Sequence, residues 1–194
     1  MKLEAANTGH NLLTKMKLGM FAAVTRDRAP DVLRLLLYRP ELFGRPFMLY
    51  VEAVLRGESS FTVGERELFA AYVSKLNRCD FCYGSHFAVA ARAMGAARVE
   101  AALTDVDATD LSDRVKASMK FLGKLTTKPA SLRASDVRTA YAAGLSRDEV
   151  EQLVHICTVF CTINSLADSL GFEVPSAATF ERMAGPLLKH GYVL

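Results

Sequence analysis

The chain has 194 residues, and its 24 Lys and Arg against 21 Asp and Glu give a net charge of +3. This near balance excludes a polybasic nucleic-acid-binding protein and an acidic tail protein. Because 51% of the residues are hydrophobic and 23% are charged, the chain can bury a core and is not of the disordered class. Its length fits one domain.

Helix signals dominate the first part of the chain, and no stretch alternates apolar and polar residues over the length of a strand. We therefore predict an all-α fold. Asp31 begins a short apolar helix that Pro40 ends or restarts. A second apolar helix starts at Pro46, and Gly57 is placed to close it.

The next two helices have the clearest boundaries. Thr62 and Glu65 form a capping box, in which each side chain satisfies a backbone donor of the first turn. Asn77 tolerates the left-handed conformation, so the chain should turn near Asn77 and Arg78. Another helix then follows and ends at Gly95.

The second half repeats this pattern more loosely. A helix ends before Pro129, and a short one covers residues 135–143. Ser146 and Glu149 form a second capping box, which begins a long apolar helix that ends at Gly171.

We interpret residues 1–194 as a single helical domain of two loosely similar halves, about 30–95 and 110–175. The longest nearly apolar run, residues 153–163, is far shorter than the ~20 residues of a membrane-spanning helix. We expect no membrane association, no signal peptide and a cytoplasmic location. A chain this rich in apolar residues needs no disulfide to fold, which favours a reactive cysteine pair over a structural one.

Cys79, Cys82 and His86 carry the most informative pattern. Two cysteines separated by two residues can form a disulfide when they straddle the first turn of a helix. The positive end of the helix dipole favours a thiolate there. Because Cys82 and His86 are four residues apart, they share one helix face, which places an imidazole beside one thiol.

The predicted turn near Asn77 can bring a carboxylate close to this imidazole. Glu67 lies ten residues before Asn77 and His86 nine residues after it, roughly 15 and 13.5 Å from the bend at 1.5 Å per residue. If the two helices run antiparallel, Glu67 comes level with His86. The predicted site is then a nucleophilic Cys82, a base His86 and an orienting Glu67, with Cys79 closing a disulfide on an oxidised Cys82.

With these residues the chain resembles the alkyl hydroperoxidase D-like (AhpD-like) branch of the carboxymuconolactone decarboxylase superfamily, particularly its uncharacterised peroxidase-related members. The likeness spans about residues 30–175. It rests on Arg39-Pro40-Glu41-Leu42, Val54-Leu55-Arg56-Gly57, Glu65-Arg66-Glu67-Leu68, Val73-Ser74, Asn77, Cys79, Cys82, His86, Ala143-Gly144-Leu145-Ser146, Asn164 and Leu166-Ala167-Asp168.

The resemblance implies an all-α homo-oligomer that reduces peroxides, with antioxidant defence as its role. Electrons would come from a dithiol donor, lipoyl or thioredoxin-like, and no metal or organic cofactor is required. In this family Glu67 and His86 would match the proton-relay residues, and Cys79 and Cys82 the redox pair. Where the characterised hydroperoxidase has another His between the cysteines, this chain has Phe81.

Three alternatives stay open. Phe81 favours a redox-responsive interaction module whose disulfide state changes without turnover. A structural zinc site could use the cysteine pair, His86 and either Cys157 or His155. A lactone decarboxylase is disfavoured, because those relatives generally lack the cysteine pair. Cys157 and Cys161 themselves are expected to be buried free thiols.

Overall fold

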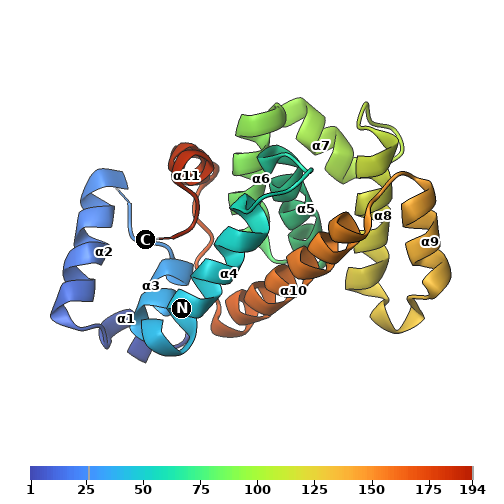
Figure 1. Cartoon of the computed structure of the whole chain (residues 1–194). Helices are drawn as coiled ribbons and strands as arrows, with labels where there is room; N and C mark the ends of the chain where they lie inside the picture. Colours follow the sequence, from blue (N-terminus) through green and yellow to red (C-terminus); the bar gives the residue numbers. More distant parts are fainter. Residues whose placement is uncertain (26, 194) are drawn as a thin grey trace.

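The computed structural model describes residues 1–25 and 27–193, with the side chains of residues 24 and 25 left aside. The described residues form helices and no strand, which confirms the all-α prediction. The elements are drawn in Figure 1. In chain order they are α1 (Ala5–Thr8), α2 (Leu12–Thr25), α3 (Asp31–Tyr38), the π-helix η1 (Pro40–Gly44), α4 (Arg45–Arg56), α5 (Val63–Leu76), α6 (Asp80–Met94), α7 (Ala96–Thr104), α8 (Asp113–Thr127), the 3₁₀ turn η2 (Pro129–Ser131), α9 (Ala134–Ala142), α10 (Arg147–Leu170) and α11 (Ala177–His190).

Both predicted capping boxes are confirmed. Thr62 accepts from the backbone N–H of Glu65, and the Glu65 carboxylate accepts from the backbone N–H of Thr62. Ser146 and Glu149 do the same at the start of α10. These caps fix the first turns of α5 and α10, the two helices around which the core is built.

The turn between α5 and α6 differs in one detail from the prediction. Asn77 keeps a right-handed conformation, and Arg78 is the residue with a positive φ, at 60°. The amide of Asn77 is committed elsewhere, since it donates to Asn164 Oδ1 at 3.1 Å. Arg78 thus takes the left-handed conformation of the reversal.

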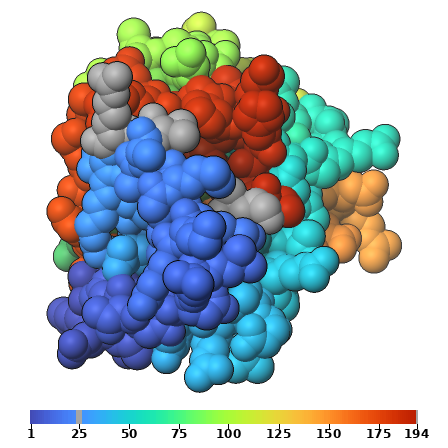
Figure 2. Space-filling view, turned by 90° about the vertical axis from the view of Figure 1, so that its left-hand side faces the viewer, coloured from blue at the N-terminus to red at the C-terminus, as the bar shows by residue number. Residues whose placement is uncertain are grey.

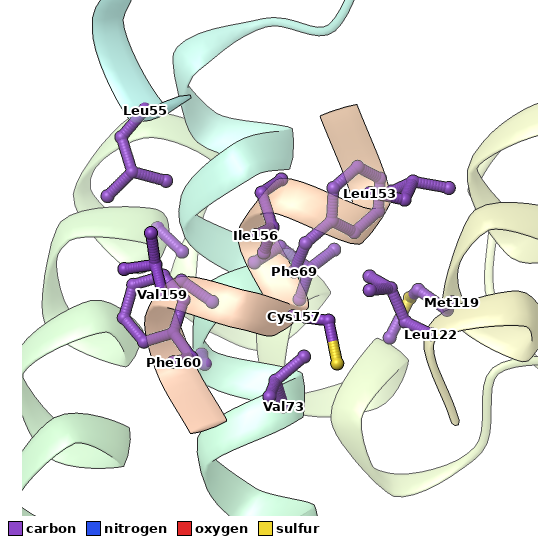
Figure 3. Close-up of a cluster of buried hydrophobic side chains, with 14 of the residues drawn as sticks. Leu55, Phe69, Val73, Met119, Leu122, Leu153, Ile156, Cys157, Val159 and Phe160 are labelled. Carbon is purple, nitrogen blue, oxygen red and sulfur yellow. The ribbon is translucent and has the colours of Figure 1, made fainter. Parts of the chain in front are cut away.

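The centre of the molecule is the antiparallel hairpin of α5 and α6, which makes the most extensive contact between helices. α10 crosses this hairpin, and α8 packs against both α5 and α10 (Figure 1). Figure 3 shows the apolar side chains that fill the space between α5, α8 and α10, among them Phe69, Met119 and Ile156. Each of these three is fully buried.

By length and composition α10 could cross a membrane, since its 24 residues contain a window of mean hydropathy 1.4. In the structure, however, it is a core helix. It packs against α4, α5, α6, α8 and α9, and its Leu153, Ile156 and Phe160 are almost fully buried. This packing accounts for the apolar residues on the buried face of α10.

Among the described residues, four α-helices were not predicted: α1, α2, α7 and α11. α11 packs mainly on α6 and brings the C-terminal residues back toward the centre of the fold. In Figure 2 the C-terminal segment, drawn in red, lies on the same face as the blue N-terminal helices. The division of the chain into two similar halves stays a prediction.

Candidate active site

The hairpin brings together the acid and the imidazole that the helical rise predicted to be level. Glu67 lies on α5 and His86 on α6, and His86 Nδ1 is 2.7 Å from Glu67 Oε2. Both side chains are buried, and Glu67 is completely so. The predicted proximity of these two residues is therefore confirmed.

The second oxygen of Glu67 has two further partners. Arg56, at the end of α4, places its guanidinium 2.6 Å from Oε1. The hydroxyl of Tyr192, which follows α11, donates to the same oxygen at 2.8 Å. The guanidinium also lies over the Tyr192 ring, 5.0 Å from its centre. Glu67 is thus a buried carboxylate held by a cation, an imidazole and a phenol.

These partners keep Glu67 ionised. Burial acts to raise the pKa of Glu67, but the charge and hydrogen bond of His86, followed by those of Arg56, outweigh it and leave the pKa below its ordinary value. Burial and the neighbouring carboxylate raise the pKa of Tyr192 well above its usual range, so that its hydroxyl stays a donor.

The hydrogen bond to Glu67 fixes the tautomer of the His86 ring. An ionised carboxylate can only accept, so Nδ1 must carry a proton. In the neutral ring Nε2 then has a free lone pair, and it can act as a base. Phe160 packs edge-on against the ring, with 4.5 Å between ring centres, and holds its orientation. Among the described residues, Nε2 of His86 makes no hydrogen bond.

The two cysteines lie at the start of α6. Cys79 occupies the N-cap position and Cys82 the first turn, and they are 1% and 3% exposed. Both are free thiols. Cys82 and His86 line the same pocket, although none of the hydrogen bonds of the described residues joins them.

The two thiols differ in acidity. The neighbouring Cys82 thiol, and then the backbone N–H of Cys82, lower the pKa of Cys79 below its ordinary value. The Cys79 thiol and burial raise the pKa of Cys82 well above its ordinary value. In the resting dithiol Cys79 is therefore the more acidic thiol, the reverse of the sequence expectation, because the Cys82 thiol and then the backbone N–H of Cys82 stabilise its charge.

A pocket of about 160 Å³ opens onto Cys82. Its polar groups are those of Cys82, Ser85, His86 and Tyr192, three of them on one face of α6. The other side chains that line it are apolar and come from Pro30 and from α2, α3, α4, α6, α10 and α11. Cys79 does not line the pocket, so a bound molecule meets Cys82 first.

Phe81, between the two cysteines, belongs to the apolar wall. Its ring packs edge-on against Phe172 and Phe180, at 5.4 and 6.1 Å between centres, and so ties α6 to α11. The zinc interpretation gains no support, because the described residues contain no group of three His, Cys, Asp or Glu placed to hold a metal ion. His155 instead bonds Tyr50, at 2.6 Å.

The sequence analysis did not find Arg56 or Tyr192 as members of the site. Arg56 shares α4 with Glu52, whose carboxylate accepts from the backbone N–H of Tyr192 at 2.6 Å. Arg56 and Glu52, one turn apart on α4, thus bind the Glu67 carboxylate and the C-terminal segment, respectively. A fully buried carboxylate needs more than one donor. The need for further partners of Glu67 could therefore be inferred, but not which residues they are.

We expect Tyr192→Phe to lower the free energy of unfolding by about 1.5–3 kcal/mol, since it removes a hydrogen bond to a buried charge. Urea unfolding of the full chain measures the change. Tyr141→Phe is the matched control, because Tyr141 is 43% exposed and the same loss of a hydroxyl there should cost less than about 0.5 kcal/mol. Equal effects of the two substitutions would contradict a structural role for the Tyr192 hydroxyl.

Comparisons with known proteins agree on the fold. The structure matches an uncharacterised peroxidase-related protein with an alkylhydroperoxidase AhpD core from Ralstonia eutropha JMP134, with a TM-score of 0.74, 20% identity, and 89% of this chain and 90% of that chain covered. A peroxidase-related protein from Silicibacter sp. TM1040 matches with a TM-score of 0.73, 20% identity and 84% and 85% covered. The debrominase Bmp8 matches with a TM-score of 0.70, 15% identity and 89% and 92% covered.

At these identities the likeness shows a shared AhpD-like fold. No curated protein matches the sequence. Residues 41–123, which contain Arg56, Glu67, Cys79, Cys82 and His86, match the carboxymuconolactone decarboxylase family. This segment therefore resembles the carboxymuconolactone decarboxylase family, and the chain as a whole shares the AhpD-like fold of the solved structures.

Proposed function

We propose that this protein is a thiol-dependent peroxidase that cycles between the Cys79 and Cys82 dithiol and its disulfide. The observation that carries the proposal is the bond between Glu67 and His86 Nδ1, which leaves Nε2 free in the pocket that Cys82 lines. A nucleophile, a base and a group that orients the base are the elements of thiol activation.

In the proposed cycle the dithiol first loses one proton to His86 Nε2, and Glu67 stabilises the imidazolium through Nδ1. The remaining proton of the pair moves to Cys79 as the Cys82 sulfur attacks the terminal peroxide oxygen. The O–O bond breaks, Cys82 becomes a sulfenic acid, and the leaving alkoxide takes the proton from Cys79.

The Cys79 thiolate then attacks the Cys82 sulfenic acid to form the disulfide. The departing hydroxide takes the proton back from His86, so that the two thiols and a hydroperoxide give a disulfide, an alcohol and water. An external dithiol, lipoyl or thioredoxin-like, would restore the pair by exchange, in the cytoplasm. The lower pKa of Cys79 suits it to this second attack.

The apolar pocket supports a second candidate function. A cavity of about 150 Å³ lined by apolar side chains can hold a single aromatic ring, which is close to the size found here. Bmp8 is a debrominase, and a Cys→Ala variant of it has been solved with 2,3,4-tribromopyrrole. In reductive dehalogenation by this chain, the dithiol would become a disulfide while a small halogenated ring loses halide and gains a proton.

We expect the wild-type protein, given excess dithiol, to consume hydrogen peroxide or cumene hydroperoxide over many turnovers. The Cys79→Ser, Cys82→Ser double variant should lose this sustained turnover. The Cys157→Ser, Cys161→Ser double variant is the matched control, because it also loses two thiols yet should keep turnover.

Three other outcomes would decide against a peroxidase. A single equivalent consumed without further turnover indicates a redox-responsive module. Halide release from a bromopyrrole without peroxide turnover indicates a dehalogenase. If wild type and the Cys79, Cys82 double variant consume peroxide equally, the proposal fails.

We also propose that the chain assembles into a homo-oligomer through α2. Its Leu12, Leu13, Met16 and Met20 are each more than 60% exposed, and soluble proteins rarely leave such a cluster uncovered. Leu13→Glu with Met16→Glu should reduce the mass measured by light scattering to that of one chain, whereas Lys17→Glu on the same helix should not. A monomeric wild-type protein would contradict the proposal.

A further inference from the structure

A second pair of thiols lies on α10, outside the pocket. Cys157 and Cys161 are one helical turn apart, and their sulfur atoms are 3.7 Å from each other. Cys157 is buried beside α8, where Figure 3 shows it near Met119 and Leu122. Cys161 is partly exposed. One thiol of the pair can therefore be reached from solvent while the other cannot.

Polar groups from two neighbouring helices are arranged around the two sulfurs. The Asn77 side chain, at the end of α5, donates to Cys161 Sγ at 3.6 Å. The Thr126 hydroxyl, on α8, lies 3.6 Å from Cys157 Sγ. The groups that act on the pair are the two thiols themselves, Asn77 and Thr126, and all these side chains are uncharged.

This arrangement favours one thiolate, on Cys161. The Cys157 thiol, followed by the Asn77 amide, lowers the pKa of Cys161 to about 6. The Cys161 thiol and burial together raise the pKa of Cys157, so that Cys157 keeps its proton. A partly exposed thiolate with a thiol beside it has the properties of an oxidation-sensitive cysteine.

The helix restricts what can follow oxidation. Side chains four residues apart on a helix have Cβ atoms about 5–6 Å apart, whereas a disulfide requires about 3.5–4.5 Å. Cys157 and Cys161 therefore cannot close a disulfide without distorting α10. The Phe160 ring, which packs on His86, and the buried Ile156 anchor this part of the helix in the core.

We propose that Cys161 is a second site of peroxide oxidation, at which the Cys157 thiol and the Asn77 amide stabilise the reacting sulfur. The Cys161 thiolate attacks the terminal oxygen of a hydroperoxide, an S–O bond forms and the O–O bond breaks. The sulfur is oxidised by two electrons to a sulfenic acid. The peroxide is reduced to an alkoxide, which takes a proton from water. α10 keeps this sulfenic acid apart from Cys157.

The oxidised Cys161 sulfur would lie beside Asn77, in the turn between α5 and α6. Asn77 bonds both Cys161 and Asn164, and Asn164 Nδ2 donates to the buried Ser74 hydroxyl at 3.2 Å. An oxygen added to Cys161 must be accommodated beside Asn77, two residues before Cys79.

The test uses the full chain with Cys79→Ser and Cys82→Ser, so it is independent of the proposed peroxidase activity. Hydrogen peroxide is added in the presence of dimedone, which traps sulfenic acids, and the labelled cysteine is found by peptide mass spectrometry. We expect the label on Cys161 and about tenfold less on Cys157. A Cys157–Cys161 disulfide, a label mainly on Cys157, or no label at all would overturn the proposal.

A second measurement tests the role of Cys157. In the same background the rate of iodoacetamide alkylation of Cys161 should have its midpoint near pH 6. Cys157→Ala removes the donor and should move this midpoint upward, whereas Cys157→Ser keeps an O–H donor and should move it less. Circular dichroism checks that both variants fold. A midpoint in the ordinary thiol range in all three proteins would contradict the proposal.

Discussion

Replacing Cys82 with serine should abolish both turnover and the first oxidation by peroxide, whereas replacing Cys79 should abolish turnover alone. The reason is position. Cys82 lines the pocket and Cys79 does not, so a bound hydroperoxide reaches the Cys82 sulfur first. Without Cys79 the sulfenic acid on Cys82 still forms, but it has no thiol with which to close a disulfide.

Stopped-flow measurement of one equivalent of peroxide, followed by dimedone labelling, checks this order. Both single variants are made with Cys157→Ser and Cys161→Ser, so that the thiols of α10 do not contribute. Cys79→Ser should give one equivalent of label on Cys82, and Cys82→Ser should give none. The opposite pattern would assign the first attack to Cys79, the more acidic thiol of the resting pair.

The proximity of Glu67 and His86 could be predicted because local rules fix it. A capping box sets the start of α5, a turn follows Asn77, and the rise per residue then places the two side chains level. Each step needs only residues close in sequence. The all-α fold followed from the same kind of evidence, since helix caps and the spacing of apolar residues are local signals.

The remaining partners of Glu67 could not be predicted from local rules. Arg56 lies on a different helix, and Tyr192 follows α11, 125 residues from Glu67 in sequence. Tyr192 belongs to no motif, and the Val54-Leu55-Arg56-Gly57 motif does not indicate what Arg56 contacts. The positions of both residues depend on how α4 and α11 pack on the hairpin. The acidity of the two cysteines was missed for a similar reason, because it depends on the environment of each sulfur and not on the spacing to His86 alone.

Glu67→Gln should destabilise the protein by about 3–5 kcal/mol, because it leaves the Arg56 charge without its buried partner. The Arg56 side chain is 11% exposed and cannot recover its hydration without moving. Urea unfolding at neutral pH measures the loss. Asp110→Asn is the matched control, since the Arg98 and Asp110 pair is exposed and should contribute no more than about 1 kcal/mol.

A double substitution separates the charge from the packing. Arg56→Met with Glu67→Leu replaces both members of the pair by apolar side chains, and we expect it to recover part of the stability that Glu67→Gln loses, since the Tyr192 hydroxyl and His86 Nδ1 still lack their acceptor. It should not recover peroxide turnover, because His86 Nδ1 has lost the carboxylate that orients the ring. A double variant no more stable than Glu67→Gln would contradict the ion-pair explanation.

The same carboxylate should make stability depend on pH in the acid range. Its pKa is lower in the folded protein than the ordinary value of 4.5, so the unfolded chain binds the proton more readily. The stability that Glu67 contributes is therefore fully present above pH 4.5 and is lost as the pH falls toward the folded pKa. In Glu67→Gln this part of the acid-side decrease should be absent, so the free energies of unfolding of the two proteins should converge as the pH is lowered. Curves that stay parallel down to acid unfolding would show that Glu67 is not the group responsible.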